Sequence, residues 1–217
     1  MVLRHDSQAE PAQEDELFVR FVNTLEVSRG QPVEHLTGID ALLAWLNDEG
    51  LISGRGRASE AAKLHRDPKE GQRRVQRFQR LRDVLRASAR DLRERGDVSA
   101  GHRGERNHIL RHGLHYHQLH QDRGETRFTV SQVGDRLDQA RATIAGSFAH
   151  FLAADGPDRL RICANDGCRY LFIDRSPAGR RRWCDMRTCG NQAKVARHRA
   201  RARGTADDGL PSAHASV

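Results

Sequence analysis

Apolar residues recur at helical spacing between residues 14 and 154, and this pattern predicts a mostly helical body. In the segment 14–25 they fall at positions i, i+1, i+4, i+5 and i+8, on one helical face. The most regular seam belongs to the segment 72–95, where arginines cover the other faces and Gly96 is a stop signal. The residues expected to be buried in these two segments are Leu17, Phe18, Phe21, Val22, Leu25, Val75, Phe78, Leu81, Leu85 and Leu92.

The same pattern predicts the remaining elements of the body. In the segment 37–50, the Thr37 hydroxyl can cap a helix by accepting the amide of Asp40, and Gly50 can end it. Further helices are expected over 59–65, 107–121 and 135–154, with a polar loop over 97–104 and a strand over 127–130. An Asp-Gly-Pro run ending at Pro157 then breaks the chain, which predicts a domain boundary there.

Charge is distributed unevenly along the chain. Its 217 residues are 37% apolar, which is enough for a core, and carry a formal net charge of +8. The segment from Arg159 to Arg203 contains 13 Lys and Arg against three acidic residues, whereas the remainder contains 24 basic and 26 acidic residues. A compact basic segment on a near-neutral body is typical of a module that binds a polyanion. A solvated basic tail is the alternative.

The sequence contains no feature of a membrane or secreted protein. No apolar run approaches the ~18 residues that a membrane span needs. The N-terminus from Met1 to Asp6 lacks the apolar core of a signal peptide. We therefore expect a cytoplasmic protein without a membrane partner.

All four cysteines lie in the basic segment, as Cys163, Cys168, Cys184 and Cys189. They form two C-x4-C pairs separated by fifteen residues, a spacing that can close a tetrahedral thiolate site on Zn²⁺. Disulfides are the alternative, but they are disfavoured in the cytoplasm. A catalytic zinc would need an open coordination position and a nearby general base. We expect one structural zinc ion per chain and no enzymatic activity.

The residues around the cysteines predict a small ordered unit. The segments 170–174 and 180–183 are each typical of a short strand, and the turn residues at 176–179 would join them as a hairpin. Asn191 would cap a basic helix over 192–203. The expected order is knuckle, β-hairpin, knuckle and helix, in a unit so small that metal binding would supply most of its folding energy. With its helical body, the chain is predicted to be mainly α.

The motifs of this unit closely resemble those of the CGNR zinc finger family. They comprise the first cysteine pair around Ala-Asn-Asp-Gly, the run Phe172 to Asp174, the run Arg181 to Met186, and the run Cys189 to Lys194. Gln192 stands where the family name places an arginine. The resemblance covers about 40 residues and implies a zinc-binding module.

In that family the finger commonly follows a helical domain called ABATE, which is described as a stress-induced transcription regulator. The apolar pattern of the first half of this chain is similar to that domain. The resemblance implies a bacterial-type transcription factor. Residues 1–157 would form the regulatory or homodimerising domain, 158–204 the zinc finger with its basic helix, and 205–217 a disordered tail.

Basic residues form two candidate nucleic-acid surfaces, one on the predicted hairpin and one on the terminal helix. A helix that is basic nearly all round suits a groove or a phosphate-lined channel better than a protein core. The candidate contact residues are Arg180, Arg181, Arg182, Arg187, Lys194, Arg197, His198, Arg199, Arg201 and Arg203. DNA is the expected partner. An RNA-binding or ribosome-associated protein is the alternative, because a zinc-stapled basic helix suits RNA equally well.

Six histidines crowd the segment 102–120. On a helix, His108, His112 and His115 would share a face at i, i+4 and i+7, a spacing that can bind a metal ion or an effector. Solvated surface histidines are the simpler interpretation. A second alternative for the whole chain is a small-molecule-binding protein or zinc enzyme acting through the helical domain. It predicts a deep polar pocket near these histidines.

Overall fold

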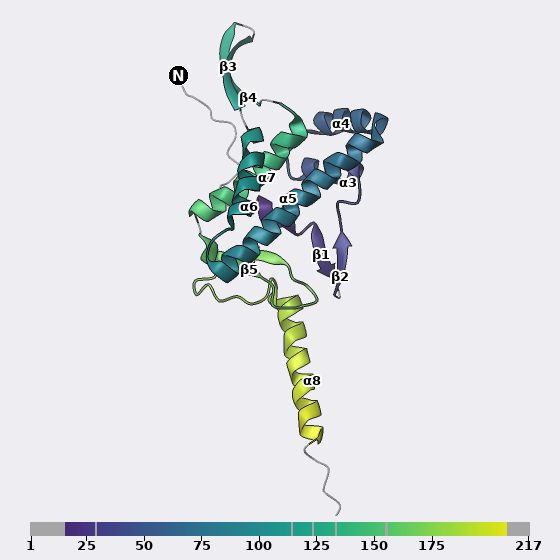
Figure 1. Cartoon of the computed structure of the whole chain (residues 1–217), viewed down its shortest axis with the longest axis vertical. Coiled ribbons are helices and arrows are strands. Elements are labelled where there is room, and N and C mark those ends of the chain that lie inside the picture. Colours follow the sequence, from purple (N-terminus) through teal and green to yellow (C-terminus); the bar gives the residue numbers. More distant parts are fainter. Residues whose placement is uncertain are drawn as a thin grey trace, which may run out of the picture.

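The computed structural model describes residues 16–28, 30–113, 115–122, 124–132, 134–154 and 156–207. The helices in this part of the chain are α2 (Leu17–Val22), α3 (Ile39–Asp48), α4 (Gly54–Arg66), α5 (Pro68–Arg95), α6 (Ala100–Leu110), α7 (Arg136–Ala154) and α8 (Asn191–Asp207) (Figure 1). The strands pair antiparallel as β1 (Leu25–Ser28) with β2 (Gln31–Glu34), β3 (His115–Asp122) with β4 (Glu125–Gln132), and β5 (Leu160–Ile162) with β6 (Leu171–Ile173). The chain is mainly α, as its apolar pattern predicts.

Helix α2 is the centre of the core, although it is only six residues long. Phe18 packs edge-on against Phe148 of α7 with ring centroids 5.0 Å apart, and Phe21 packs against Phe78 of α5 at 6.2 Å. Aromatic pairs in this geometry add about 0.5–1.5 kcal/mol each beyond their burial. The predicted burial is confirmed for Leu17, Phe18, Phe21 and Val22. The helix ends at Val22, and the fifth residue, Leu25, begins β1 and is only partly buried.

Helix α5 begins four residues before its apolar seam predicts. Asp67 caps it by accepting the amide of Glu70 at 3.0 Å, and Pro68 occupies the first helical position, where a missing N–H is harmless. The predicted end is confirmed, because Gly96 adopts the left-handed conformation with a φ of 74°. The seam itself is buried, at Val75, Phe78, Leu81, Leu85 and Leu92.

The prediction of one helix over 107–121 is wrong. Helix α6 ends at Leu110, a single 3-10 turn covers 111–113, and His115 begins β3. Strand β3 pairs along its whole length with β4, which contains the strand predicted over 127–130. The backbone of β3 forms its hydrogen bonds with β4 instead of with residues one helical turn away. The spacing of apolar residues within 107–121 does not reveal such a partner.

Two helix starts also differ from expectation. Gly38 rather than Thr37 precedes α3, and no side chain caps that helix. The loop predicted over 97–104 is largely helical, because the Ser99 hydroxyl accepts the amide of His102 and starts α6. Both differences concern the residue that precedes the first helical turn, a position for which neighbouring small residues are similarly suited.

The cysteine-bearing segment shares the core of the helical body. Strands β5 and β6 pair in the register Leu160 to Ile173 and Ile162 to Leu171. Leu160, Leu171 and Ile173 are all buried and belong to the same apolar cluster as the phenylalanines of α2. The residues before and after position 157 are therefore packed around one core.

The hairpin expected between 170–174 and 180–183 is not formed. Strand β6 lies in the first of these segments, but its partner is β5, which precedes Cys163. The segment 180–183 contains no strand, and it is linked to the first knuckle by the Ala164 N–H, which donates to the Arg182 carbonyl at 2.8 Å. The strand pairing therefore frames the first cysteine pair instead of filling the space between the two pairs.

Helix α8 projects from the body as a single rod, on the side away from the β3–β4 hairpin (Figure 1). The helix predicted over 192–203 is confirmed and continues to Asp207, while residues 208–217 of the expected tail lie outside the described part. Within the described part, no helix has both the length and the apolar character that a bilayer crossing requires.

Candidate metal centre and basic helix

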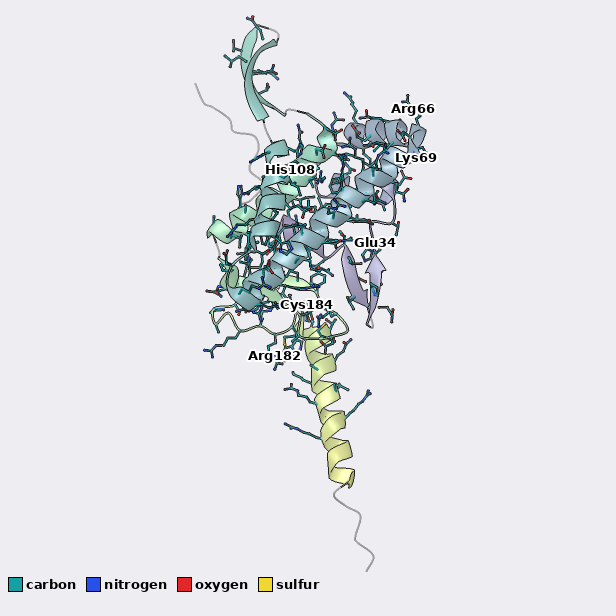
Figure 2. All side chains as sticks on the ribbon, in the orientation of Figure 1. Glu34, Arg66, Lys69, His108, Arg182 and Cys184 are labelled. Carbon is teal, nitrogen blue, oxygen red and sulfur yellow. The ribbon has the colours of Figure 1, made fainter. Side chains whose placement is uncertain are left out.

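The four predicted ligands converge at the base of α8, where Figure 2 shows Cys184. The Sγ atoms of Cys163, Cys168, Cys184 and Cys189 all lie within 4.8 Å of one another, and the Cys168–Cys184 and Cys184–Cys189 separations are 3.7 and 3.8 Å. A tetrahedral ion with Zn–S bonds of about 2.3 Å needs sulfurs about 3.8 Å apart. All four cysteines are free rather than disulfide-bonded. The sulfurs thus fit zinc, and the geometry supports a zinc-binding site.

Asn165 organises the turn of the first cysteine pair. Its Oδ1 accepts the Gly167 N–H at 3.0 Å, and its carbonyl accepts the N–H groups of Cys168 at 2.9 Å and Arg169 at 3.1 Å. Arg169 takes a left-handed conformation with a φ of 56°, which turns the chain back toward β6. The Cys163 N–H then donates to the Tyr170 carbonyl at 2.8 Å and closes the knuckle.

Asp185 organises the turn of the second pair. Its Oδ1 accepts the N–H groups of Arg187 at 2.6 Å and Thr188 at 3.1 Å, which starts the π-type turn Met186–Gly190. A Cβ atom at position 190 would lie only 2.8 Å from the Met186 sulfur. Glycine has no Cβ atom, so Gly190 fits the turn without displacing the Met186 side chain. The turn runs directly into α8, so the candidate ligand Cys189 is continuous with the helix.

The protonation of the thiols depends on their burial. Burial raises the pKa of Cys168 to about 11 and, together with the neighbouring sulfurs, raises the pKa of Cys184 further. Burial acts in the same direction on Cys189, but a hydrogen bond from Asn165 and contacts with the other thiols outweigh it and lower that pKa. Zinc binds the thiolate form, so metal binding at this site releases protons.

Asp174 is the buried organiser of the loop between the cysteine pairs, and sequence reasoning missed this role. Its Oδ1 accepts the amide and the hydroxyl of Ser176 at 3.0 and 2.6 Å, and its Oδ2 accepts the Arg181 N–H at 2.7 Å. Burial raises the pKa of Asp174, but these hydrogen bonds outweigh it and hold the pKa below its ordinary value. An aspartate two residues before a serine is a local signal for such a turn.

Two arginines fasten the same loop, Arg159 just before β5 and Arg161 within it. Arg159 donates to the Ser176 carbonyl at 2.8 Å, and Arg161 donates to the Gly179 carbonyl at 2.9 Å. These two cations belong to the positive excess of the segment, yet their guanidinium groups are committed to backbone carbonyls. They therefore act in positioning the loop rather than in binding a ligand.

An aromatic pair covers the buried side of the thiols. Phe172 and Trp183 pack with Cys163 and Cys189 in one small apolar cluster. Arg181 lies over the Phe172 ring at 5.1 Å and donates to the Cys184 carbonyl at 2.6 Å, and Arg182 lies over the Trp183 ring at 5.2 Å. Of the predicted contact residues, these two arginines therefore also hold the metal module together.

The other predicted contact residues lie on open surface. Arg180 and Arg187 are exposed at the base of the finger. On α8 the exposed cations are Lys194, Arg197, His198, Arg199 and Arg201, whereas the side chain of Arg203 lies outside the described part. Because α8 projects alone, these cations surround a helix that has no protein core to face.

The first turn of α8 is tied to both knuckles. Asn191 does not act as the predicted N-cap, because it has helical dihedral angles and its side chain donates to the Arg187 carbonyl at 3.0 Å. Gln192, at the position of the family arginine, accepts the Asn165 amide at 2.8 Å. Gln192 therefore braces the helix against the first knuckle, which is one of the roles that an arginine could fill there.

The histidine cluster is only partly assembled. The rings of His108 and His112 lie 5.5 Å apart in an edge-to-face arrangement, but His115 belongs to β3 and its side chain is outside the described part. The predicted single helical face of three histidines is therefore wrong. His102 is structural, since its Nδ1 lies 2.7 Å from the Asp91 carboxylate of α5.

A hollow in the body lies elsewhere. It measures about 360 Å³ and is lined mainly by apolar atoms at the meeting point of α3, α4 and α5, with Leu64, His65 and Val75 among its residues. Neither His108 nor His112 lines it. It is thus distinct from the polar pocket that the enzyme alternative predicts.

Comparison with known families covers nearly all of the described chain. Residues 15–155 match the ABATE family model, whose description is "Putative stress-induced transcription regulator". Residues 159–202 match the model of the CGNR zinc finger. A search of curated proteins found no match.

Proposed function

The chain belongs to the ABATE family and ends in a CGNR zinc finger, and on this basis we propose that it is a DNA-binding transcriptional regulator. The observation that carries the proposal is the exposed basic helix α8, which follows the candidate metal centre directly and projects from the helical body (Figure 1). A helix of this kind fits the major groove of duplex DNA, which is about 12 Å wide.

The cations of α8 would supply the affinity. Lys194, Arg197 and Arg199 are exposed, and their side chains form no hydrogen bond or ion pair with the residues that the structure describes. Binding would replace condensed counterions along the phosphate backbone, so the affinity should fall steeply with salt. In this proposal the helical body regulates the finger, to which it is joined through a shared core.

Zinc would have a structural part in this function. Cys163, Cys168, Cys184 and Cys189 would hold one ion per chain, and with four thiolate ligands no coordination position remains for a substrate. The ion would supply folding free energy by closing the two knuckles around α8. The protein's own residues would bind DNA, and no enzymatic step is part of the proposal.

The test is binding of the zinc-loaded full chain to genomic duplex DNA fragments, with structured RNA as a competitor. A chain that ends at Gly190 is the sharpest control, because it removes α8 and keeps the metal ligands and β6. Truncation near residue 158 is less informative, because it would remove Leu160, Leu171 and Ile173 from the core. Equal DNA binding by the chain ending at Gly190 would refute the proposal, and preferential capture by RNA would favour the RNA-binding alternative.

A further inference from the structure

The surface of α8 has two chemically different sides. Successive residues of a helix turn by about 100°, so Lys194, Arg197 and Arg201 at i, i+3 and i+7 form one stripe. Val195 and Arg199, at i and i+4, form a second stripe on a different side. Among the side chains that the structure describes, the first stripe contains only cations, whereas the second combines the aliphatic Val195 with Arg199.

The second stripe borders a hollow at the base of the helix. This hollow of about 510 Å³ is lined mostly by apolar atoms and lies between the π-type turn and α8. Its residues are Arg187, Thr188, Asn191, Gln192, Val195, Ala196 and Arg199. Val195 is 47% exposed, and the other described side chains of α8 are polar or alanine. Val195 is thus an exposed apolar side chain on an otherwise polar helix. Burial of such a side chain requires a partner that is not part of the described chain.

Resting on the proposed function, we infer that the Val195–Arg199 side of α8 contacts base edges and that the Lys194–Arg197–Arg201 side contacts phosphates. A thymine C5-methyl group is the apolar feature that the major groove offers to Val195, and guanine O6 and N7 are the acceptors that suit Arg199. The two residues are one helical turn apart, so they would reach neighbouring base pairs. The substrate class is therefore duplex DNA with a thymine and a guanine close together in the site.

The cationic stripe suits a backbone strand. Lys194 and Arg201 are seven residues apart, which is about 10 Å along the helix axis. Each DNA strand carries one phosphate per about 3.4 Å of duplex axis, so a stripe of this length can reach several phosphates of one strand. Such contacts carry no direct sequence information.

The intramolecular contacts of the first turn favour this division. Gln192 is held by the Asn165 amide and Asn191 by the Arg187 carbonyl, so both amides already serve to set the direction of α8. Val195 and Arg199 lie beyond this anchored turn, and Arg199 makes no hydrogen bond or ion pair within the described part of the chain. Gln192 is thus a positioning residue, and the specificity residues are Val195 and Arg199.

The experiment selects preferred sites from random duplexes with the zinc-loaded full chain, and it repeats the selection with Arg199→Gln, Val195→Ala and Arg197→Gln. We expect Arg199→Gln to lose discrimination for one G·C pair by roughly 10- to 100-fold, and Val195→Ala to relax one A·T position. Arg197→Gln should keep the selected sequence and weaken binding to all sequences alike, with a salt slope smaller by about 1.

The three variants are matched, because every altered side chain is exposed on the same helix; zinc content and helical circular dichroism verify their folding. An unchanged selected sequence for both Arg199→Gln and Val195→Ala would overturn the inference and leave the proposed function standing. Binding of the unaltered chain to DNA without any sequence preference would do the same. Absence of DNA binding by the unaltered chain would overturn both the inference and the proposed function.

Discussion

Asn23 of the helical body and Leu171 of the finger form a reciprocal pair of buried hydrogen bonds. The Asn23 amide donates to the Leu171 carbonyl at 2.8 Å, and its Oδ1 accepts the Leu171 N–H at 3.0 Å. Asn23 follows α2, the central helix of the core, and Leu171 starts β6, which leads toward the aromatic cover of the thiols. A displacement of α2 would therefore be transmitted directly to the metal module.

Asn23→Ala should destabilise the whole chain. The change leaves the N–H and the carbonyl of Leu171 buried without partners, at a cost of about 1–3 kcal/mol for each group. We expect the free energy of unfolding to fall by about 2–6 kcal/mol in urea titrations, with zinc stoichiometry unchanged. Glu16→Gln is the control, because its ion pair with Arg175 joins the same two parts at 3.2 Å but is exposed. A comparable loss for both variants would show that the buried pair has no special role.

Removal of zinc should affect the helical body as well as the finger. Leu160, Leu171 and Ile173 anchor the finger strands in the main core, so loss of the metal would loosen residues that the body needs. Each kcal/mol lost lowers Tm by about 2–4 °C at this chain length. Since a structural zinc contributes several kcal/mol, we expect a drop on the order of 10 °C or more on chelation.

The measurement is a thermal melt followed by the helical circular dichroism signal, with and without chelator. A single transition that moves to lower temperature is expected, because finger and body share a core. Two separate transitions, with that of the body unchanged, would contradict the coupling. Cys184→Ser, which removes one of the four candidate ligands, provides a comparison with weakened zinc binding in which no chelator is present.

The extent to which the sequence predicted this structure depends on how local each signal is. Helix α5 was predictable because its apolar seam and Gly96 all lie within one segment. The cluster of four cysteines was predictable for the same reason, since two close pairs in the sequence define it. In contrast, β3 depends on pairing with β4, and β5 depends on pairing with a strand beyond the first knuckle. Such pairings are set by tertiary contacts that local periodicity does not contain.

The buried carboxylate of Asp174 shows the same limit within the candidate site. Asp174 belongs to a motif that was recognisable in the sequence. Its contacts with Ser176 and the Arg181 backbone, however, depend on its buried position directly after β6. The arginines of the finger differ in their contacts, and a count of charges did not predict this difference. Arg159 and Arg161 donate to backbone carbonyls of the loop, whereas Arg197, Arg199 and Arg201 of α8 are exposed.

Asp174→Asn should weaken the loop that carries Arg180 to Arg182. One oxygen of the carboxylate becomes an NH₂ group, which cannot accept a hydrogen bond from Ser176 or from the Arg181 N–H. We expect the free energy of unfolding to fall by about 1–3 kcal/mol. Asp166→Asn is the matched control, because Asp166 is exposed in the same module and forms an exposed ion pair with Arg169. Equal stability of the two variants in urea titrations would contradict the assigned role.

The Asp91–His102 contact predicts a pH dependence of stability in the helical body. The hydrogen bond from His102 and the Ser99 amide lower the pKa of Asp91 from 3.8 to about 2. A carboxyl group with a lowered folded-state pKa contributes stability that is complete above its ordinary pKa and is lost as the pH falls toward the folded value. Asp91→Asn should therefore melt below the unaltered chain at pH 7, and the difference should shrink between about pH 4 and pH 2.

Comparison of the two melting curves at each pH isolates this group, because zinc release and other carboxyl groups affect both proteins alike. Asp97→Asn is the control, since the Asp97–Arg103 ion pair lies at the same N-terminus of α6 but is exposed. It should differ little from the unaltered chain at any pH. A difference for Asp91→Asn that stays constant from pH 7 to pH 2 would show that the lost stability comes from packing at this position and not from the charge of Asp91.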